Sequence, residues 1–330
     1  MVEAGRRAQA ESLVHAMQTN PGEASATALA CIEVGATPER LTWLDEALRA
    51  GRLPDFVIEE LGRRSKWLES ASEDEFLDLV QVMATGGPIA CSAALDLFVA
   101  RYQQPRERAL SLLELLLSAL APASTHGMTD YHWELGAKML VDGGMAARAA
   151  ELAVLALMRE RGSNDFAWNV LHHASECDAS GAFQAVARGL EAPGHGGRIL
   201  VAFWYHRVAF AWPANDVLAW VGDDERRGRA AAGIVRVRSE ELPEVLRELI
   251  WRFGPQSSVA REIMVRMGST DGMVPSLADH VREQLDRARH WIDDPDPPIA
   301  AFAKKLVDDL EKQYEQHAAY EEDERRRFGT

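Results

Sequence analysis

Apolar residues recur with the period of an α-helix along almost the whole chain. Phe76, Leu79, Val80 and Met83 occupy positions i, i+3, i+4 and i+7, and the same rule holds over three turns between residues 242 and 253. This spacing places one apolar stripe along one face of a helix. The pattern predicts an all-α protein of roughly 16–18 helices, each of about 10–20 residues, joined by short turns.

Strand signals are nearly absent. One short segment, "GIVRVRS" at residues 233–239, alternates apolar and basic residues. A single short strand would have no partner in a sheet. We therefore interpret this segment as the end of a helix, with a short strand as the alternative.

Local motifs mark several helix ends. Ser72 and Glu75 form the capping-box pattern, in which each side chain bonds the backbone N–H of the other residue. Thr37 followed by Pro38 fits an N-cap with proline at the first helical position. The segment 86–88, "GGP", combines a glycine suited to a left-handed conformation with a proline that cannot continue a helix.

Pairs of helices predict a repeating architecture. Residues 287–314, "RARHWIDDPDPPIAAFAKKLVDDLEKQY", join two apolar-periodic segments through an acid–proline turn at 293–298. Trp133, Trp168, Trp204, Trp251 and Trp291 follow one another at intervals of 35, 36, 47 and 40 residues. Helix-pair repeats have periods of about 34–47 residues. The preferred fold is therefore an α-solenoid of antiparallel helix pairs, with an irregular helical bundle as the alternative.

A solenoid needs no internal domain boundary, because each repeat contacts only its neighbours. We expect one elongated helical-repeat domain over residues 1–330, with a possible subdivision at the loop 121–130. The charged tail 320–330, an acidic block followed by a basic one, is expected to fray from the last helix.

A resemblance to a known family covers the last quarter of the chain. Within about residues 246–327, the stretches "LIWRFGPQSSVAREIMVRMGSTDGMVPS" and "ARHWIDDPDPPIAAFAKKLVDDLEKQYEQHAAYEEDE" resemble HEAT-like repeats. They are similar to the C-terminal helical arm of bacterial NACHT-type and related phage-defence multidomain proteins. In that family the arm senses or binds a partner, and the chemistry belongs to another domain. The nucleotide-binding domain of that family is not found in these 330 residues, so the resemblance implies partner binding and not nucleotide hydrolysis.

The composition limits the partners. The formal net charge is −15, and such a surface repels a phosphate backbone unless a local basic patch compensates. We therefore expect a protein partner and no nucleic acid. The most apolar run, residues 109–121, is too short for a bilayer of roughly 30 Å and contains Glu114. We expect no membrane association, and the sequence makes no prediction about the oligomeric state.

The cysteines and the N-terminal sequence point to the cytoplasm. Cys31, Cys91 and Cys177 are odd in number, far apart and free of any CxxC spacing. This usage is typical of free thiols in a reducing compartment. The N-terminal residues contain no apolar core of a secretory signal. The expected localisation is cytoplasmic.

An aromatic segment at residues 198–213 is the candidate partner-binding site. Phe203, Trp204, His206, Arg207 and Trp212 gather there, and three successive aromatic residues, 203–205, point in different directions on a helix. Exposed rings in such a cluster would line a peptide groove, with Arg207 pairing an acidic ligand. The alternative is that the same rings pack in the core.

Two weaker candidates lie on either side of residue 185. His173 and Cys177 are i, i+4 neighbours and would fit part of a zinc site, but the second pair, His172 and Glu176, faces elsewhere. The loop 193–198, "PGHGGR", would present backbone N–H groups to an anion, but it lacks the phosphate-loop spacing. We expect ordinary structural residues in both places, and no cofactor.

The sequence favours a non-enzymatic interaction protein that binds a partner on the concave face of a helical array, in a bacterial defence or signalling complex. Motifs such as GxSxG, HExxH and GxGxxG do not occur. Two alternatives from other classes remain. One is a HEAT-like DNA glycosylase or another nucleic-acid-acting enzyme, which would require a continuous arginine-lined groove. The other is a sensor of a small ligand built around Trp204.

Overall fold

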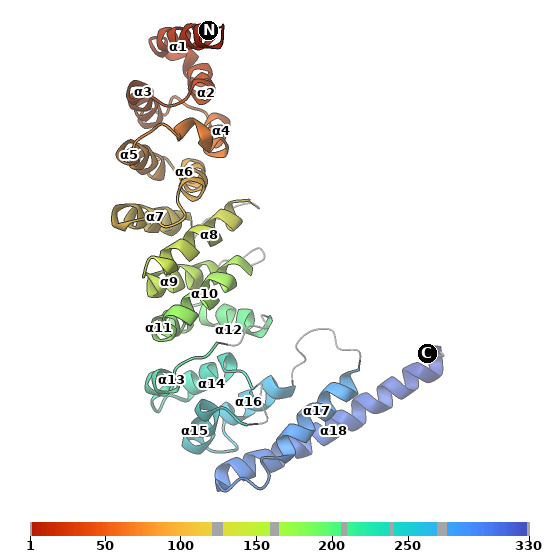
Figure 1. Ribbon diagram of the computed structural model, residues 1–330. Helices are drawn as coiled ribbons and strands as arrows, with labels where there is room; N and C mark the ends of the chain where they lie inside the picture. The colour runs from red at the N-terminus through yellow and green to blue at the C-terminus, as the bar shows by residue number, and fades with distance from the viewer. Residues whose placement is uncertain are drawn as a thin grey trace. The chain divides into compact units, whose positions relative to one another are not determined.

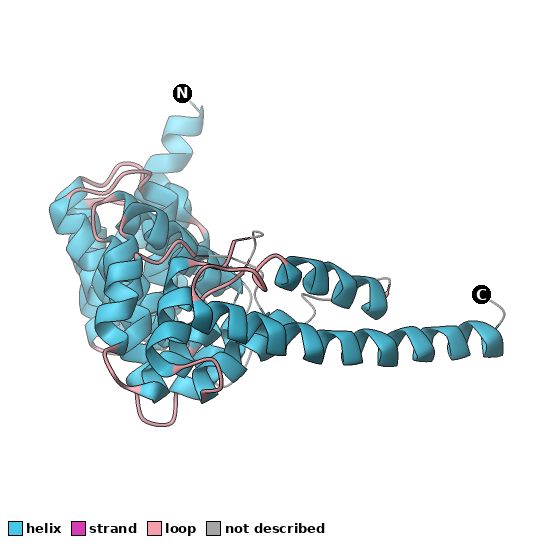
Figure 2. Ribbon diagram, turned by 90° about the horizontal axis from the view of Figure 1, so that it is seen from below, coloured by secondary structure: helices cyan, strands magenta, loops and turns pink. Residues whose placement is uncertain are grey.

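The protein is all-α throughout the part of the chain that the structure describes. The computed structural model describes residues 2–120, 128–158, 165–205, 210–237, 241–268 and 276–328. These residues contain 18 α-helices and two 3-10 helices, without a strand, which confirms the predicted class and helix number (Figure 2). Among the described helices, none is long and apolar enough to span a membrane.

The chain divides into two compact units, residues 1–178 and 179–330. Unit 1 contains ten α-helices and both 3-10 helices in its described residues. Its elements are α1 (Val2–Gln18), η1 (Pro21–Glu23), α2 (Ala24–Val34), α3 (Pro38–Arg49), α4 (Asp55–Arg63), η2 (Ser65–Leu68), α5 (Glu73–Ala84), α6 (Pro88–Arg101), α7 (Glu107–Leu120), α8 (Met128–Asp142), α9 (Ala146–Leu157) and α10 (Asp165–Cys177).

Unit 2 contains eight helices in its described residues. These are α11 (Ala179–Glu191), α12 (Gly196–Tyr205), α13 (Ala214–Val221), α14 (Glu225–Ile234), α15 (Glu244–Phe253), α16 (Ser258–Gly268), α17 (Leu277–Arg289) and α18 (Pro297–Phe328).

The helices of each unit form two rows. In unit 1, α2, α4, α6, α8 and α10 contact one another in order, and so do α3, α5 and α7 (Figure 1). In unit 2, α11, α13 and α15 form one row and α12, α14 and α16 form the other. The long helix α18 contacts α15 and α16 and packs antiparallel to α17. Each helix therefore buries its apolar stripe against the facing row and against the next helix of its own row.

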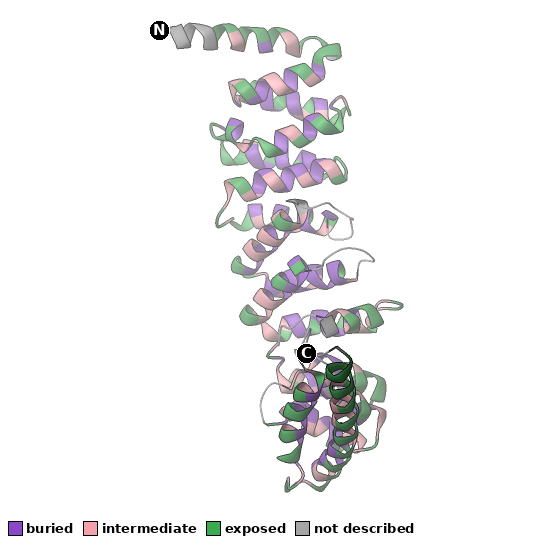
Figure 3. Cartoon of the chain, turned by 90° about the vertical axis from the view of Figure 1, so that its right-hand side faces the viewer, coloured by how far each residue is buried: buried purple, intermediate pink, exposed green. Residues whose placement is uncertain are grey.

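The core lies between the rows (Figure 3). Trp133 of α8 and Trp168 of α10 are only 2% and 1% exposed and occupy corresponding places in one row, as their interval of 35 residues predicts. Trp251 of α15 is 61% exposed and lies in the α11, α13 and α15 row of unit 2. The longer tryptophan intervals therefore do not reflect one repeating core position, since Trp251 packs differently.

The predicted helix ends are confirmed where local chemistry defines them. The Ser72 hydroxyl accepts a bond from Glu75 N at 3.3 Å, while Glu75 Oε2 accepts from Ser72 N at 2.8 Å. Thr37 caps α3, with Pro38 at the first turn. Gly87 has φ of +97° and directly precedes α6. α14 ends at Ile234, so the described part of segment 233–239 ends a helix and is not a strand.

Both helices beside the loop 121–130 belong to unit 1, and α7 contacts α8 directly. Residues 121–127 lie outside the described part. α18 continues as a helix to Phe328, with the side chains of residues 322–327 exposed. Glu321 of α18 accepts hydrogen bonds from Ala278 N and the Ser276 hydroxyl at the N-terminus of α17, and the Ala278 bond is the main cause that lowers the pKa of Glu321.

Candidate functional site

The described rings of the predicted aromatic site belong to the core of unit 2. Phe203 is 4% exposed and Trp212 is 8% exposed. Phe210 stacks on Trp212 with ring centroids 4.5 Å apart, and Phe183 of α11 lies 5.9 Å from the same ring. Burial fixes these rings in the helix packing, so they are not presented to a partner.

The remaining members of the predicted groove lie outside the described side chains. Trp204 stands in the backbone of α12, but its side chain is not described, and His206 and Arg207 are outside the described residues. The partner-binding prediction for this segment therefore stays a prediction for these three residues.

The predicted zinc pair is held in ordinary polar contacts. His173 Nε2 lies 2.8 Å from Asp142 Oδ1 of α8, and both His172 and His173 have a ring nitrogen 3.8 Å from the Glu176 carboxylate. Cys177 is exposed. Nowhere in the described residues do three His, Cys, Asp or Glu side chains come together to hold a metal ion. His173 therefore links α10 to α8.

A pocket in unit 2 gathers basic side chains from several helices. It lies where α17 passes the C-terminal halves of α14 and α16, with a volume of about 100 Å³. Its polar lining consists of Arg236, Arg266, His280, Gln284 and Arg287. The apolar lining is made by Ala232, Val235, Val237, Leu246, Ile263 and Met267.

Close packing beside the pocket fixes Arg266. An added Cβ on Gly233 would lie only 3.0 Å from Leu200 Cδ2, a tight approach, and 3.5 Å from Arg266 Nη2, an ordinary contact distance. The Arg266 side chain is 14% exposed, donates to the Leu200 carbonyl at 3.4 Å, and lies 3.9 Å from Glu262. Helix packing thus holds this guanidinium at the pocket wall.

Gln284 lines the pocket with a buried amide group that is only partly hydrogen-bonded. The residue is 7% exposed, its Nε2 lies 2.6 Å from His280 Nε2, and its Oε1 has no hydrogen-bond partner. If the amide is turned over, the other amide atom loses its partner instead, because only one of the two faces His280. A buried polar atom without a partner costs about 1–3 kcal/mol. The pocket lining therefore includes a buried amide atom without a hydrogen-bond partner.

The charge of the pocket is opposite to that of the chain. Its lining includes three arginines and no acid, although Glu262, which is not a lining residue, lies 3.9 Å from Arg266, whereas the whole protein carries −15. Elsewhere many arginines pair with acids, as Arg148 does with Glu114 and Glu151 at 2.7 Å each. The described arginines of this site thus form one small basic pocket and not an extended groove of the kind that duplex DNA requires.

The sequence did not identify this pocket. Arg236, Arg266 and Arg287 stand 30 and 21 residues apart and follow no motif. The only local signal was the basic alternation in residues 233–239, and it could not show which other residues meet it. Comparisons with family models, with curated proteins and with solved structures find no match to this chain.

Proposed function

We propose that the chain is an α-solenoid of HEAT-like helix pairs that acts as a non-enzymatic scaffold or sensor and binds a protein partner. The regular spacing of contacts within the rows carries this proposal. In unit 1, polar contacts between successive helices of a row join residues 30 to 36 positions apart, as in Arg108–Asp78, His132–Asp96, Arg148–Glu114, Asn169–Glu134 and His173–Asp142. In unit 2 the separations are 29 to 36, as in Trp220–Glu191, Ser258–Glu225 and Ser180–Asp216.

A similar sequence separation at each contact means that successive helix pairs pack against one another in a similar register. Helices α3, α5, α7 and α9 begin at residues 38, 73, 107 and 146, which gives intervals of 35, 34 and 39 residues. Helix-pair repeats stack by this rule, and their neighbouring pairs bury a continuous core. Stacked pairs expose long faces, on which proteins of this architecture bind extended partners.

The charge distribution indicates what kind of partner fits. Unit 1 has 26 acidic and 15 basic residues, a net charge of −11, while unit 2 has 25 and 21, a net charge of −4. The acidic excess is therefore concentrated in unit 1. Phe56 of α4 and Tyr131 of α8 are 58% and 55% exposed in the same row and supply apolar contact area. A basic protein surface with apolar residues complements this unit best.

The resemblance of residues 246–327 to phage-defence arms suggests a bacterial defence or signalling complex as the setting. On that view unit 1 captures the partner, and the helices of the resembling segment connect the array to the rest of the complex. A nucleic-acid-acting enzyme is the alternative and would show itself by binding DNA in the same assays.

Affinity purification of the tagged protein from its native cells identifies the partner, and reconstitution from purified components then tests direct binding. The variant Asp55→Lys/Glu69→Lys reverses two exposed acids of unit 1 that form no ion pair with another described residue. The matched control Asp308→Lys/Glu315→Lys makes the same charge change on exposed positions of α18.

Direct binding should weaken at least about tenfold in the unit 1 variant, remain within about twofold in the control, and weaken with added salt. Equal binding by both variants, or a partner that binds only unit 2, would contradict the proposal. Recovery of DNA in place of a protein would favour the enzyme alternative.

A further inference from the structure

The buried end of the unit 2 pocket carries an unfilled hydrogen-bonding position. Thr27, Arg40 and Gln284 are the buried polar or charged residues of the described chain. The Thr27 hydroxyl donates to Glu23 O at 2.9 Å, and Arg40 Nη1 donates to Gly35 O at 2.8 Å. Gln284 alone among these three keeps a side-chain atom without a partner. Most buried polar groups in folded proteins are paired, and a ligand in the pocket would supply the partner that this amide atom lacks.

Two of the arginines around Gln284 also have a structural role at helix C-termini. Cations near helix C-termini offset the negative end of the helix dipole, and Arg266 and Arg287 stand in the last turns of α16 and α17. That explanation accounts for each arginine separately. It does not explain why Arg287, which lines the same pocket as Arg236 and Arg266, forms no ion pair with another described residue.

We propose that this pocket binds the phosphate group of a small phosphate monoester. A phosphate carries a charge of about −1.5 to −2 at neutral pH and offers three acceptor oxygens, which suits several guanidinium groups better than one carboxylate does. With the Gln284 amide turned so that its oxygen accepts from the His280 ring N–H, its NH2 group would donate to a phosphate oxygen. The apolar lining from Leu246, Ile263 and Met267 would cover a short hydrocarbon part next to the ester oxygen.

The size of the pocket selects a small molecule. A volume of about 100 Å³ is below the roughly 300–1,000 Å³ of pockets for drug-sized ligands. It accommodates a phosphate with a few carbon atoms, and a nucleotide or a folded partner would remain mostly outside. This site is independent of the partner-binding face proposed for unit 1, since every lining residue belongs to unit 2.

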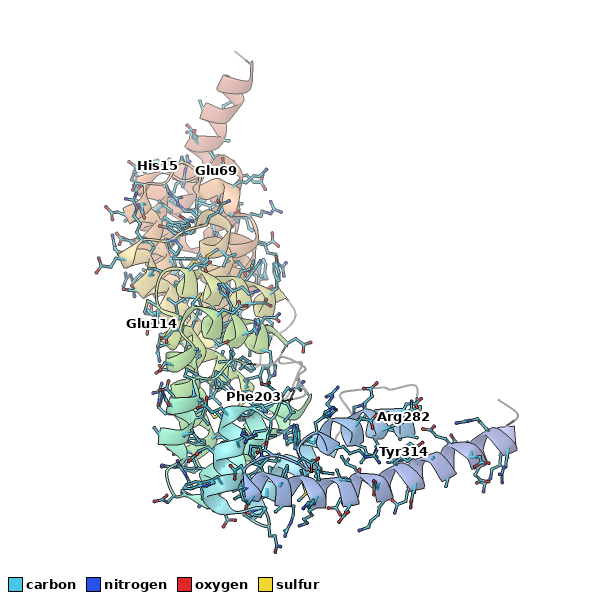
Figure 4. The ribbon with its side chains drawn as sticks, turned by 60° about the horizontal axis from the view of Figure 1, so that its bottom comes forward. His15, Glu69, Glu114, Phe203, Arg282 and Tyr314 are labelled. Carbon is cyan, nitrogen blue, oxygen red and sulfur yellow. The ribbon has the colours of Figure 1, made fainter. Side chains whose placement is uncertain are left out.

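Binding calorimetry on the full chain at low salt tests the proposal, with inorganic phosphate, propyl phosphate and propionate as probes. Two pocket variants, Arg287→Gln and Gln284→Leu, remove one charge and one amide. The matched control is Arg282→Gln, which makes the same change on an exposed side chain of the same helix (Figure 4).

We expect propyl phosphate to bind more tightly than phosphate, and phosphate more tightly than propionate. Each pocket variant should weaken propyl phosphate binding by at least about tenfold, while the control changes it by less than about twofold. Gln284→Leu should melt close to the wild type, because the lost contact to His280 is offset by removal of the unpaired amide atom. A folded variant that has lost binding would separate a ligand role from a structural one.

Three results would overturn the proposal. Absence of binding by any phosphate probe would do so, and so would equal binding by wild type and both pocket variants. Binding of a phosphoserine peptide through these residues, without binding of propyl phosphate, would replace the small ligand by a modified protein segment.

Discussion

The substitution Asp294→Asn removes one half of the ion pair that ties the acid–proline turn to α15. Arg247 donates to Asp294 through Nη1 at 2.6 Å and Nη2 at 2.9 Å, a two-bond arrangement between planar groups. The side chains of Asp294 and Arg247 are 11% and 35% exposed, so the pair is partly shielded from water. The carboxylate also accepts from Asp296 N at 3.0 Å, which closes the turn before α18.

The expected cost follows from this geometry. Asparagine keeps the shape and one acceptor oxygen but loses the charge and one of the two bonds from the guanidinium. A hydrogen bond to a charged group contributes about 1.5–3 kcal/mol, and the half-exposed arginine places this pair near the middle of that range. We expect Asp294→Asn to cost about 2 kcal/mol, which lowers the melting temperature of a unit of this size by about 4–8 °C.

The pH dependence has a definite sign. The hydrogen bonds from Arg247 are the main cause that holds the pKa of Asp294 below its ordinary value. A carboxylate with a depressed folded-state pKa contributes its stability above the unfolded-state pKa of about 3.9, and this contribution disappears as the pH falls through the folded-state pKa. The difference in melting temperature between wild type and variant should reach its whole value at neutral pH and should disappear at a pH below the folded-state pKa of Asp294.

Thermal melts across this pH range, with a double-mutant cycle to Arg247→Met, measure the effect. Asp293→Asn is the matched control, because Asp293 is exposed in the same turn and loses the same charge. A gap below about 0.5 kcal/mol at neutral pH, a coupling near zero in the cycle, or an equal loss in the control would refute the reasoning.

Three further outcomes are expected. Gly62→Ala should destabilise unit 1 by about 1–3 kcal/mol in urea unfolding, because the added methyl would lie 2.7 Å from the α6 backbone; an unchanged midpoint would contradict this close approach. A thiol reagent at pH 8 should label only Cys177 in the native protein and all three cysteines after denaturation. The reason is that Cys31 and Cys91 are buried, and burial raises the pKa of each thiol to about 11. Cys177→Ser should abolish the labelling of the native protein. Glu321→Gln should lower the melting temperature at neutral pH and have no effect well below the ordinary carboxyl pKa, because the folded pKa is depressed; equal melts at neutral pH would show that the cap on α17 contributes nothing.

The helical class and many helix ends were predictable because they depend on neighbouring residues. The i, i+3, i+4 spacing at Phe76, Leu79 and Val80 requires a helix wherever that stripe is to be buried. The capping box at Ser72 joins groups only three residues apart, so its geometry is contained in the local sequence.

The sequence could not rank the aromatic residues by exposure. Phe203 and Trp212 were expected either in a groove or in the core, and the packing of α11 against this segment decided for the core. Trp251 fitted a regular tryptophan interval, but the packing of α15 within unit 2 leaves its ring exposed. An interval along the sequence does not say how a ring on a given helix packs.

The chain by itself determined that it would fold into helices with one apolar face each, because helix formation and capping are local. Only the tertiary structure decided where the chemistry gathers. Arg236, Arg266 and the α17 residues Gln284 and Arg287 come from three separate segments, and they meet because α17 packs beside the ends of α14 and α16. That juxtaposition, and the buried amide atom it leaves without a partner, arise from long-range packing that no local pattern encodes.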